Sequence, residues 1–72
     1  MFGKIIKELR VERKMSQDEL AQKLNITQST VAKYEREDRD LNTDLIIKIC
    51  KLFNISADYL LGLENEDGTK NY

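Results

Sequence analysis

Three polar side chains in the middle of this 72-residue chain could form specific hydrogen bonds. Gln28, Ser29 and Lys33 fall on the outer face of a helix predicted over residues 28–36, because the apolar residues of that segment take the inward positions at helical spacing. A carboxamide, a hydroxyl and an ammonium group all donate hydrogen bonds, and the first two also accept them. This face has the chemistry needed to recognise a polar partner; the alternative is an ordinary solvated helix face.

The residue types that most catalysts and metal sites need are missing from the sequence. It contains no histidine, the commonest general base and metal ligand, and it has no glycine-rich phosphate loop. The single cysteine, Cys50, lies between Ile49 and Leu52 on an apolar predicted helix, so we expect a small buried side chain rather than a reactive thiol. Capping and helix-end charge explain Asp18 and Glu19. We therefore expect no enzymatic activity, no catalytic residue, no metal and no cofactor.

Length and composition fit one small globular domain. Hydrophobic residues make up 40% of the chain and charged residues 35%, and there is no proline, which favours helices joined by short turns. One cysteine cannot form an internal disulfide. No apolar run approaches the roughly 18–20 residues that cross a membrane, and the charged first segment is unlike a signal peptide. We expect a cytoplasmic protein with no membrane partner.

The net charge of −1 argues against a nucleic-acid partner when the chain is taken as a whole. The two halves differ, however. Residues 1–39 hold nine Lys or Arg against seven Asp or Glu, a balance of +2, and residues 40–72 hold three against six, a balance of −3. The positive charge therefore lies in the half that carries the polar helix face.

The hydrophobic pattern predicts an all-α fold, a compact bundle of five short helices. We expect Thr43 to cap the fourth helix, and Asn54 and Gly62 to end the last two. Residues 1–63 form the predicted domain, and the polar residues 64–72 are predicted to be a disordered tail. The predicted helices span residues 2–14, 17–24, 28–36, 44–53 and 57–61.

The second and third predicted helices are joined by a very short connection. Ser16 and Glu19 form a capping-box pattern before the second helix, and Thr27 is the expected N-cap of the third. Between them, Asn25 tolerates the left-handed conformation that a tight turn needs. Two short helices joined in this way form a helix-turn-helix. Small and aliphatic residues occupy the inward positions that it requires: Leu20, Ala21, Leu24, Ile26 and Val31.

Two segments resemble a known family. Residues 16–35, SQDELAQKLNITQSTVAKYE, resemble the helix-turn-helix of the phage repressor and Cro type, also called the XRE family, and residues 49–62, ICKLFNISADYLLG, resemble its closing helices. The resemblance covers residues 2–63. It implies a lambda repressor-like, five-helix DNA-binding domain that usually acts as a dimer.

The sequence departs from the family pattern in three places. Asn25 stands where the family often has Gly, and a Pro that is frequent near Asn42 is absent. The loop over residues 37–40 is more acidic than the usual Gly- and Lys-rich version. Because this loop often touches phosphate in the family, its acids leave Arg36 and Arg39 as the candidates for that contact.

The resemblance implies that the helix over residues 28–36 lies in the major groove of double-stranded DNA. There Gln28 can bond to adenine, Lys33 can donate to guanine, and Ser29 serves either base. The positive end of the preceding helix favours a phosphate contact by Gln17. The expected phosphate contacts are Arg10, Gln17, Thr27, Thr30, Arg36 and Arg39.

Two further groups of residues have alternative interpretations. Arg10 and Glu35 resemble a family ion pair that bridges the first helix and the end of the third, and the alternative is two solvated charges. An apolar surplus near the end of the chain suggests a symmetric dimer contact, and the alternative is closure of the monomer core. A dimer would match two half-sites about one helical turn apart. The candidate dimer residues are Tyr59, Leu60 and Leu63.

The leading functional hypothesis is a sequence-specific transcriptional regulator, a repressor acting as a homodimer on an inverted-repeat operator. The sequence does not separate a phage-like repressor, a restriction-modification controller and an antitoxin. The alternative class is a protein-interaction module, or an antitoxin-type partner, that keeps the fold with weak or no DNA binding of its own. Its protein partner, a toxin or an antirepressor, is not identified by the sequence. Steep salt dependence is the property that separates a phosphate binder from this alternative.

Overall fold

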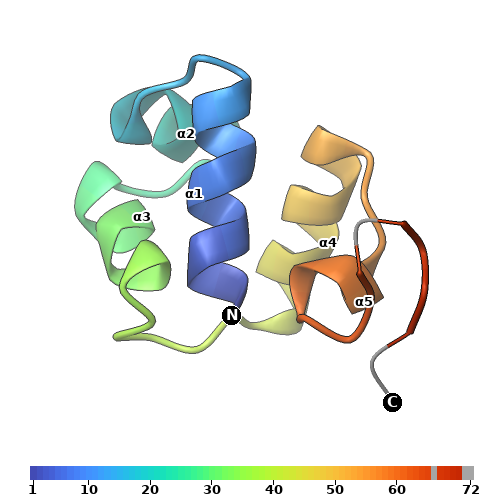
Figure 1. The fold of residues 1–72 in the computed structure, drawn as a ribbon. Helices are drawn as coiled ribbons and strands as arrows, with labels where there is room; N and C mark the ends of the chain where they lie inside the picture. Colours follow the sequence, from blue (N-terminus) through green and yellow to red (C-terminus); the bar gives the residue numbers. More distant parts are fainter. Residues whose placement is uncertain (66, 71–72) are drawn as a thin grey trace.

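The computed structural model describes residues 1–65 and 67–70. In that part of the chain α1 stands at the centre, α2 and α3 lie on one side of it, and α4 and α5 lie on the other (Figure 1). This arrangement confirms the predicted all-α bundle. Its helices are α1 (Phe2–Glu12), α2 (Gln17–Leu24), α3 (Gln28–Glu35), α4 (Thr43–Phe53) and α5 (Ala57–Leu60).

Side-chain oxygens cap four of these helices at their first turns. Ser16 Oγ accepts from the backbone N–H of Glu19 at 3.0 Å, and the Glu19 carboxylate accepts from the Ser16 backbone, so the predicted capping box is confirmed. Thr27 caps α3 as expected, and Ser56 caps α5. The cap of α4 is Asn42, whose Oδ1 accepts from the Leu45 N–H at 2.8 Å. The prediction of Thr43 as the cap is wrong by one residue, because Asn42 and Thr43 are adjacent and both residue types favour the N-cap position.

The helices end in left-handed residues that close the last turn. Asn25 has φ 57° and Asn54 has φ 54°, and Gly62 follows α5 with φ 80°, as the sequence predicts. Lys14 and Glu37 adopt the same conformation, with φ 55° and 59°. Each is followed by a residue whose N–H bonds back to the helix, Met15 to the Arg10 carbonyl and Asp38 to the Lys33 carbonyl, which is the Schellman pattern. These two ends stop α1 and α3 earlier than predicted.

A continuous apolar core fills the space between the two sides of the bundle. Its most deeply buried large side chains include Ile6 of α1, Leu20 of α2, Ile49 and Phe53 of α4, and Leu60 of α5. Leu60 is 0% exposed, so its assignment to a dimer contact is wrong. It closes the monomer core, because α5 packs against both α1 and α4.

The segment after α5 folds back on it as a turn (Figure 1). Glu64 pairs with Lys70 in an antiparallel bridge, and the N–H of Asn65 bonds to the Thr69 carbonyl at 2.7 Å. The Lys70 ammonium lies 2.6 Å from Glu64 and 3.0 Å from Asp58. The structure folds residues 64, 65 and 67–70 into this turn, where the sequence predicts a disordered tail. Residues 66, 71 and 72 of the predicted tail lie outside the described residues.

Two kinds of feature are absent from the described residues. None of their helices is both long enough and apolar enough to cross a membrane. Within residues 1–65 and 67–70, no group of three or more Cys, Asp or Glu side chains is placed to hold a metal ion. Cys50 is half-buried rather than fully buried, and burial raises the pKa of its thiol.

Candidate nucleic-acid interface

Helices α2 and α3 pack directly on each other across a short turn. Asn25 forms this turn in the left-handed conformation, with φ 57° and ψ 44°. The N–H of Ile26 bonds to the Ala21 carbonyl at 2.9 Å, and Ala21 is 1% exposed. The small side chain of Ala21 thus sits where the two helices meet. This is the predicted helix-turn-helix.

The outer face of α3 carries the three predicted recognition residues. Gln28, Ser29 and Lys33 are all exposed, and Val31 and Tyr34 are buried on the opposite face. Positions 28, 29 and 33 share a face because an α-helix repeats every 3.6 residues. The structure therefore brings the three side chains together on one accessible surface, with Gln28 at the N-terminal end of the helix.

A chain of hydrogen bonds connects Gln28 to the interior. The Gln28 amide donates to Gln17 Oε1 at 2.6 Å, and the Gln17 amide donates to Glu35 Oε1 at 3.1 Å. Arg10 then donates to both oxygens of Glu35, at 2.7 and 3.2 Å. Four side chains from α1, α2 and α3 are thus linked in series, which fixes the position of the first recognition residue. The ion pair was expected from the sequence; its extension through the two glutamines was not, because Gln17 and Gln28 lie on different helices and no sequence pattern shows how α2 and α3 cross.

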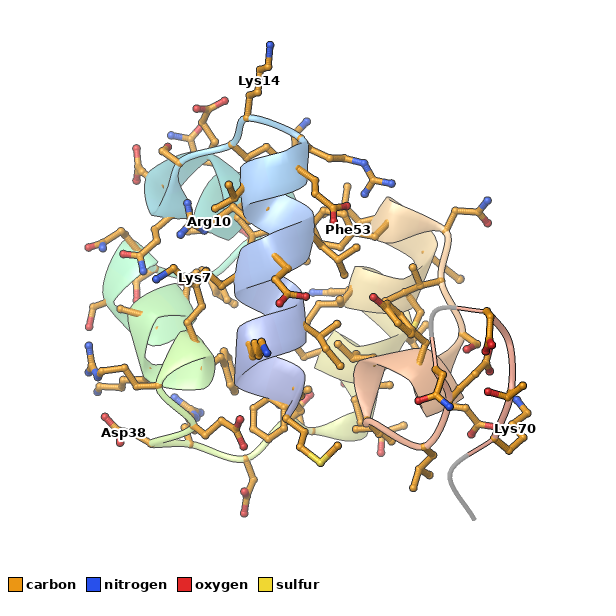
Figure 2. All side chains as sticks on the ribbon, viewed as in Figure 1. Lys7, Arg10, Lys14, Asp38, Phe53 and Lys70 are labelled. Carbon is orange, nitrogen blue, oxygen red and sulfur yellow. The ribbon has the colours of Figure 1, made fainter. Side chains whose placement is uncertain are left out.

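The Arg10–Glu35 pair is shielded from water. The side chains of Arg10 and Glu35 are 12% and 5% exposed, and Arg10 also donates to the Met15 carbonyl at 2.9 Å. Figure 2 shows the Arg10 side chain between the upper part of α1 and its neighbours. With so little of the guanidinium accessible, this geometry favours the structural role of Arg10 over the phosphate contact expected from the sequence.

Three of the other predicted phosphate contacts line a groove beside the N-terminus of α3. Thr27 and Thr30 line it with Arg39, and their hydroxyl oxygens lie 2.7 Å apart. The Arg39 guanidinium lies 5.8 Å from the centre of the buried Tyr34 ring, within the range of a cation–π contact. Lys48 of α4 lines the same groove. Lys48 is not among the residues predicted from the sequence, although its place outside the apolar stripe of the fourth helix is a usable signal.

The acidic loop after α3 pairs with nearby cations. The Arg36 Nε donates to Asp38 Oδ2 at 2.9 Å, and the chain's terminal ammonium pairs with Glu37. This hydrogen bond from the ammonium lowers the pKa of the Glu37 carboxyl. Of the predicted phosphate contacts, Arg36 therefore already has its Nε–H bonded to a carboxylate of the same loop, which offsets the positive charge of its guanidinium. The position of Asp38 in this loop is marked in Figure 2.

Fold and site together define a helix-turn-helix domain of the phage repressor and Cro type. A family model described as helix-turn-helix matches residues 6–60, which is most of the chain. The protein belongs to this family.

The chain is similar to proteins named as a transcriptional regulator and as an antitoxin. The HTH-type transcriptional regulator ImmR of Bacillus subtilis strain 168 is 45% identical over 70 residues, which cover 97% of this chain and 54% of ImmR. The antitoxin PezA of Streptococcus pneumoniae serotype 4 is 36% identical over 62 residues, covering 86% of this chain and 39% of PezA. The chain spans about half the length of the curated relatives it matches.

A solved structure of the same fold contains DNA. The biofilm regulator SinR in complex with DNA superposes with a TM-score of 0.76 and 29% identity, over 85% of this chain and 98% of the SinR chain. Its similarity extends across nearly the whole of that protein's DNA-complexed chain.

Proposed function

We propose that this protein binds double-stranded DNA sequence-specifically and regulates transcription, as a repressor that acts as a homodimer on an inverted-repeat operator. Helix α3 enters the major groove, where Gln28, Ser29 and Lys33 contact base edges. Thr27 and Thr30 contact backbone phosphates at one end of this helix. The protein performs no catalysis and works in the cytoplasm.

The observation that carries this proposal is the anchored, exposed face of α3. Recognition of bases needs side chains that are accessible and held in register, because base-edge contacts depend on precise hydrogen-bond geometry. Gln28 meets both conditions, since it is exposed and is held by Gln17 at 2.6 Å. The name of ImmR and the DNA-bound structure of SinR support the same function.

The experiment is a selection of bound duplexes from a random pool, carried out with the wild type, Gln28→Ala and Lys33→Ala. We expect an enriched inverted repeat, with one position in each half-site relaxed in each variant, because each base contact carries about 1–3 kcal/mol of discrimination. Gln22→Ala and Lys51→Ala are matched controls. They remove the same residue types from exposed positions on α2 and α4, and should leave the enriched sequence unchanged.

Two results of this selection would contradict the proposal. Weak binding with no enriched sequence, unaffected by Gln28→Ala or Lys33→Ala, would remove α3 as the recognition helix. Equal relaxation in the control variants would show that the effect is not specific to the α3 face.

A second candidate function is that of an antitoxin-type protein partner. The 36% identity to the antitoxin PezA over 62 residues and the acidic loop after α3 favour it. A protein partner would bind without the linear fall of log affinity with log salt that phosphate contacts produce. Titration of a fluorescent random duplex between 50 and 200 mM salt therefore separates the two candidates.

A further inference from the structure

The loop after α3 holds a cation–carboxylate pair on the face proposed to meet DNA. Arg36 and Asp38 are joined at 2.9 Å, and both side chains are more than half exposed, at 62% and 58%. An exposed pair of this kind contributes little to folding stability, about 0–1 kcal/mol. The carboxylate at position 38 therefore contributes little to folding stability through its pair with Arg36.

Arg36 lies where a DNA phosphate would be reached. It follows Lys33 by three residues and Ser29 by seven, so it continues the same helical face one and two turns further along. Eight residues separate it from Gln28, a rise of about 12 Å, and the major groove is about 12 Å wide. In the proposed docking of α3, with Gln28 at the base edges, we therefore expect Arg36 at the end of the helix to approach the DNA backbone.

The backbone fixes Asp38 in reach of Arg36. The Asp38 N–H bonds to the Lys33 carbonyl at 2.9 Å, and the Glu37 N–H bonds to the Tyr34 carbonyl at 3.1 Å. Glu37 occupies the left-handed position between them, with φ 59°. The closing turn of α3 thus aims the Asp38 carboxylate back at the helix end, independently of any ligand.

We infer that Asp38 is an intramolecular competitor of DNA phosphate for the Arg36 guanidinium. A carboxylate and a phosphate oxygen accept the same charge-assisted hydrogen bonds from Arg. While Asp38 accepts from Arg36 Nε–H, its negative charge offsets the positive charge of the guanidinium, so Arg36 attracts phosphate less strongly and the sequence-independent affinity for DNA is lower. This inference rests on the proposed DNA-binding function. Asp38 affects DNA binding only through Arg36 and does not itself contact DNA.

The test compares Asp38→Asn with Asp40→Asn on a random-sequence duplex at several salt concentrations. Both variants remove one negative charge from the same exposed loop, but within residues 1–65 and 67–70 the Asp40 side chain, unlike that of Asp38, has no hydrogen-bond or ion-pair partner. Release of Arg36 adds one phosphate contact, which steepens the slope of log affinity against log salt by about 0.9 and raises affinity up to about eightfold at 0.1 M salt. Asp40→Asn should leave the slope unchanged.

A second pair of variants connects the effect to Arg36. In an Arg36→Gln background, Asp38→Asn should alter neither the slope nor the affinity beyond the change that Asp40→Asn causes. Thermal unfolding of each variant checks that the α3 end is intact, because the bond from the Asp38 N–H remains in Asp38→Asn.

The possible outcomes separate this inference from the proposed function. If wild type and variants all bind the duplex without salt dependence, the proposed function fails. If the wild type binds with a steep salt slope and Asp38→Asn matches Asp40→Asn, only the competition between Asp38 and phosphate is refuted. A loss of affinity in Asp38→Asn would also overturn it, because Asp38 would then orient Arg36 toward phosphate.

Discussion

The buried Arg10–Glu35 pair is connected through hydrogen bonds to Gln28, the residue proposed to contact bases. Glu35 accepts from Arg10 and from Gln17, and Gln17 in turn accepts from the exposed Gln28. Removing one member of a buried pair leaves the other charge unpaired in a poorly solvated place, which costs far more than the intact pair contributes. Loss of the Arg10–Glu35 pair should therefore both destabilise the core and release Gln17 and Gln28 on the outer face of α3.

Arg10→Met should lower the free energy of unfolding by about 3 kcal/mol, because it strands the Glu35 carboxylate with one amide donor. Urea denaturation measures this change. Arg36→Met is the matched control, since it breaks a pair whose side chains are 62% and 58% exposed and should cost less than about 1 kcal/mol. Equal losses in the two variants would show that burial of the Arg10–Glu35 pair has no energetic consequence.

Lys14 is predicted to destabilise the fold. It occupies a left-handed conformation, with φ 55°, which a residue with a Cβ rarely adopts. That conformation costs a residue with a Cβ about 1–2 kcal/mol. Glycine avoids this strain, but it loses more conformational entropy on folding, which offsets part of the gain in stability. Lys14→Gly should therefore raise the free energy of unfolding by about 0.5–1 kcal/mol in urea denaturation. Lys23→Gly, inside α2, should lower it by about 1 kcal/mol; a loss in both variants would contradict the strain at Lys14.

At the scale of helices, the sequence predicted most of what local chemistry determines. The Ser16 capping box and the turn at Asn25 follow from residue types that favour those conformations, and both are confirmed. Lys14 and Glu37 end their helices without such a preference, so tertiary packing overrides their local tendency and no sequence signal could find them. The order of the Gln28–Gln17–Glu35 bonds was equally hidden, because it depends on how α2 and α3 cross.

Close packing of the start of α1 against the end of α3 depends on Gly3. A Cβ at this position would lie 2.5 Å from the Glu35 carbonyl oxygen and 2.8 Å from that of Tyr34. Backbone atoms cannot rotate away as side chains can, so α1 and α3 would have to separate. We expect Gly3→Ala to reduce the unfolding free energy by about 1–3 kcal/mol, whereas Lys4→Ala, at an exposed position of the same turn, should change it little. A neutral Gly3→Ala would show that the two helices separate at no cost.

The turn after α5 should respond to acid through Glu64. The Lys70 ammonium and the Ser56 hydroxyl donate to this carboxylate and lower its pKa. The stability that this contact gives to the folded state is therefore fully present above the ordinary glutamate pKa of about 4.3. It is lost as the pH falls through the lower pKa of the folded state. Carbon NMR should place the Glu64 titration below that ordinary value.

Lys70→Met provides the comparison, since it removes the main donor and should move the Glu64 midpoint upward. Lys51→Met, an exposed lysine of α4, should leave it in place. An identical midpoint in all three proteins would mean that the turn does not hold Glu64 in solution.

At the scale of the whole molecule, the small size of the recognition surface favours assembly of two copies. One α3 offers few base contacts, and two linked half-sites gain affinity through effective concentration without any new contact. A net charge of −1 opposes association only weakly. Of the predicted dimer residues, Leu63 is 40% exposed just after α5, and with the neighbouring Leu61, 38% exposed, it is available for the proposed dimer contact.

Leu63→Asp should therefore weaken binding to a duplex with two half-sites by about tenfold or more and leave binding to one half-site unchanged, because it places a charge in the dimer contact. Val11→Asp is the matched control, since Val11 is 56% exposed on α1, away from α5. Sedimentation of both variants over a range of concentrations gives the association state directly. If Leu63→Asp and Val11→Asp associate and bind alike, the end of α5 is not where two copies of this chain meet.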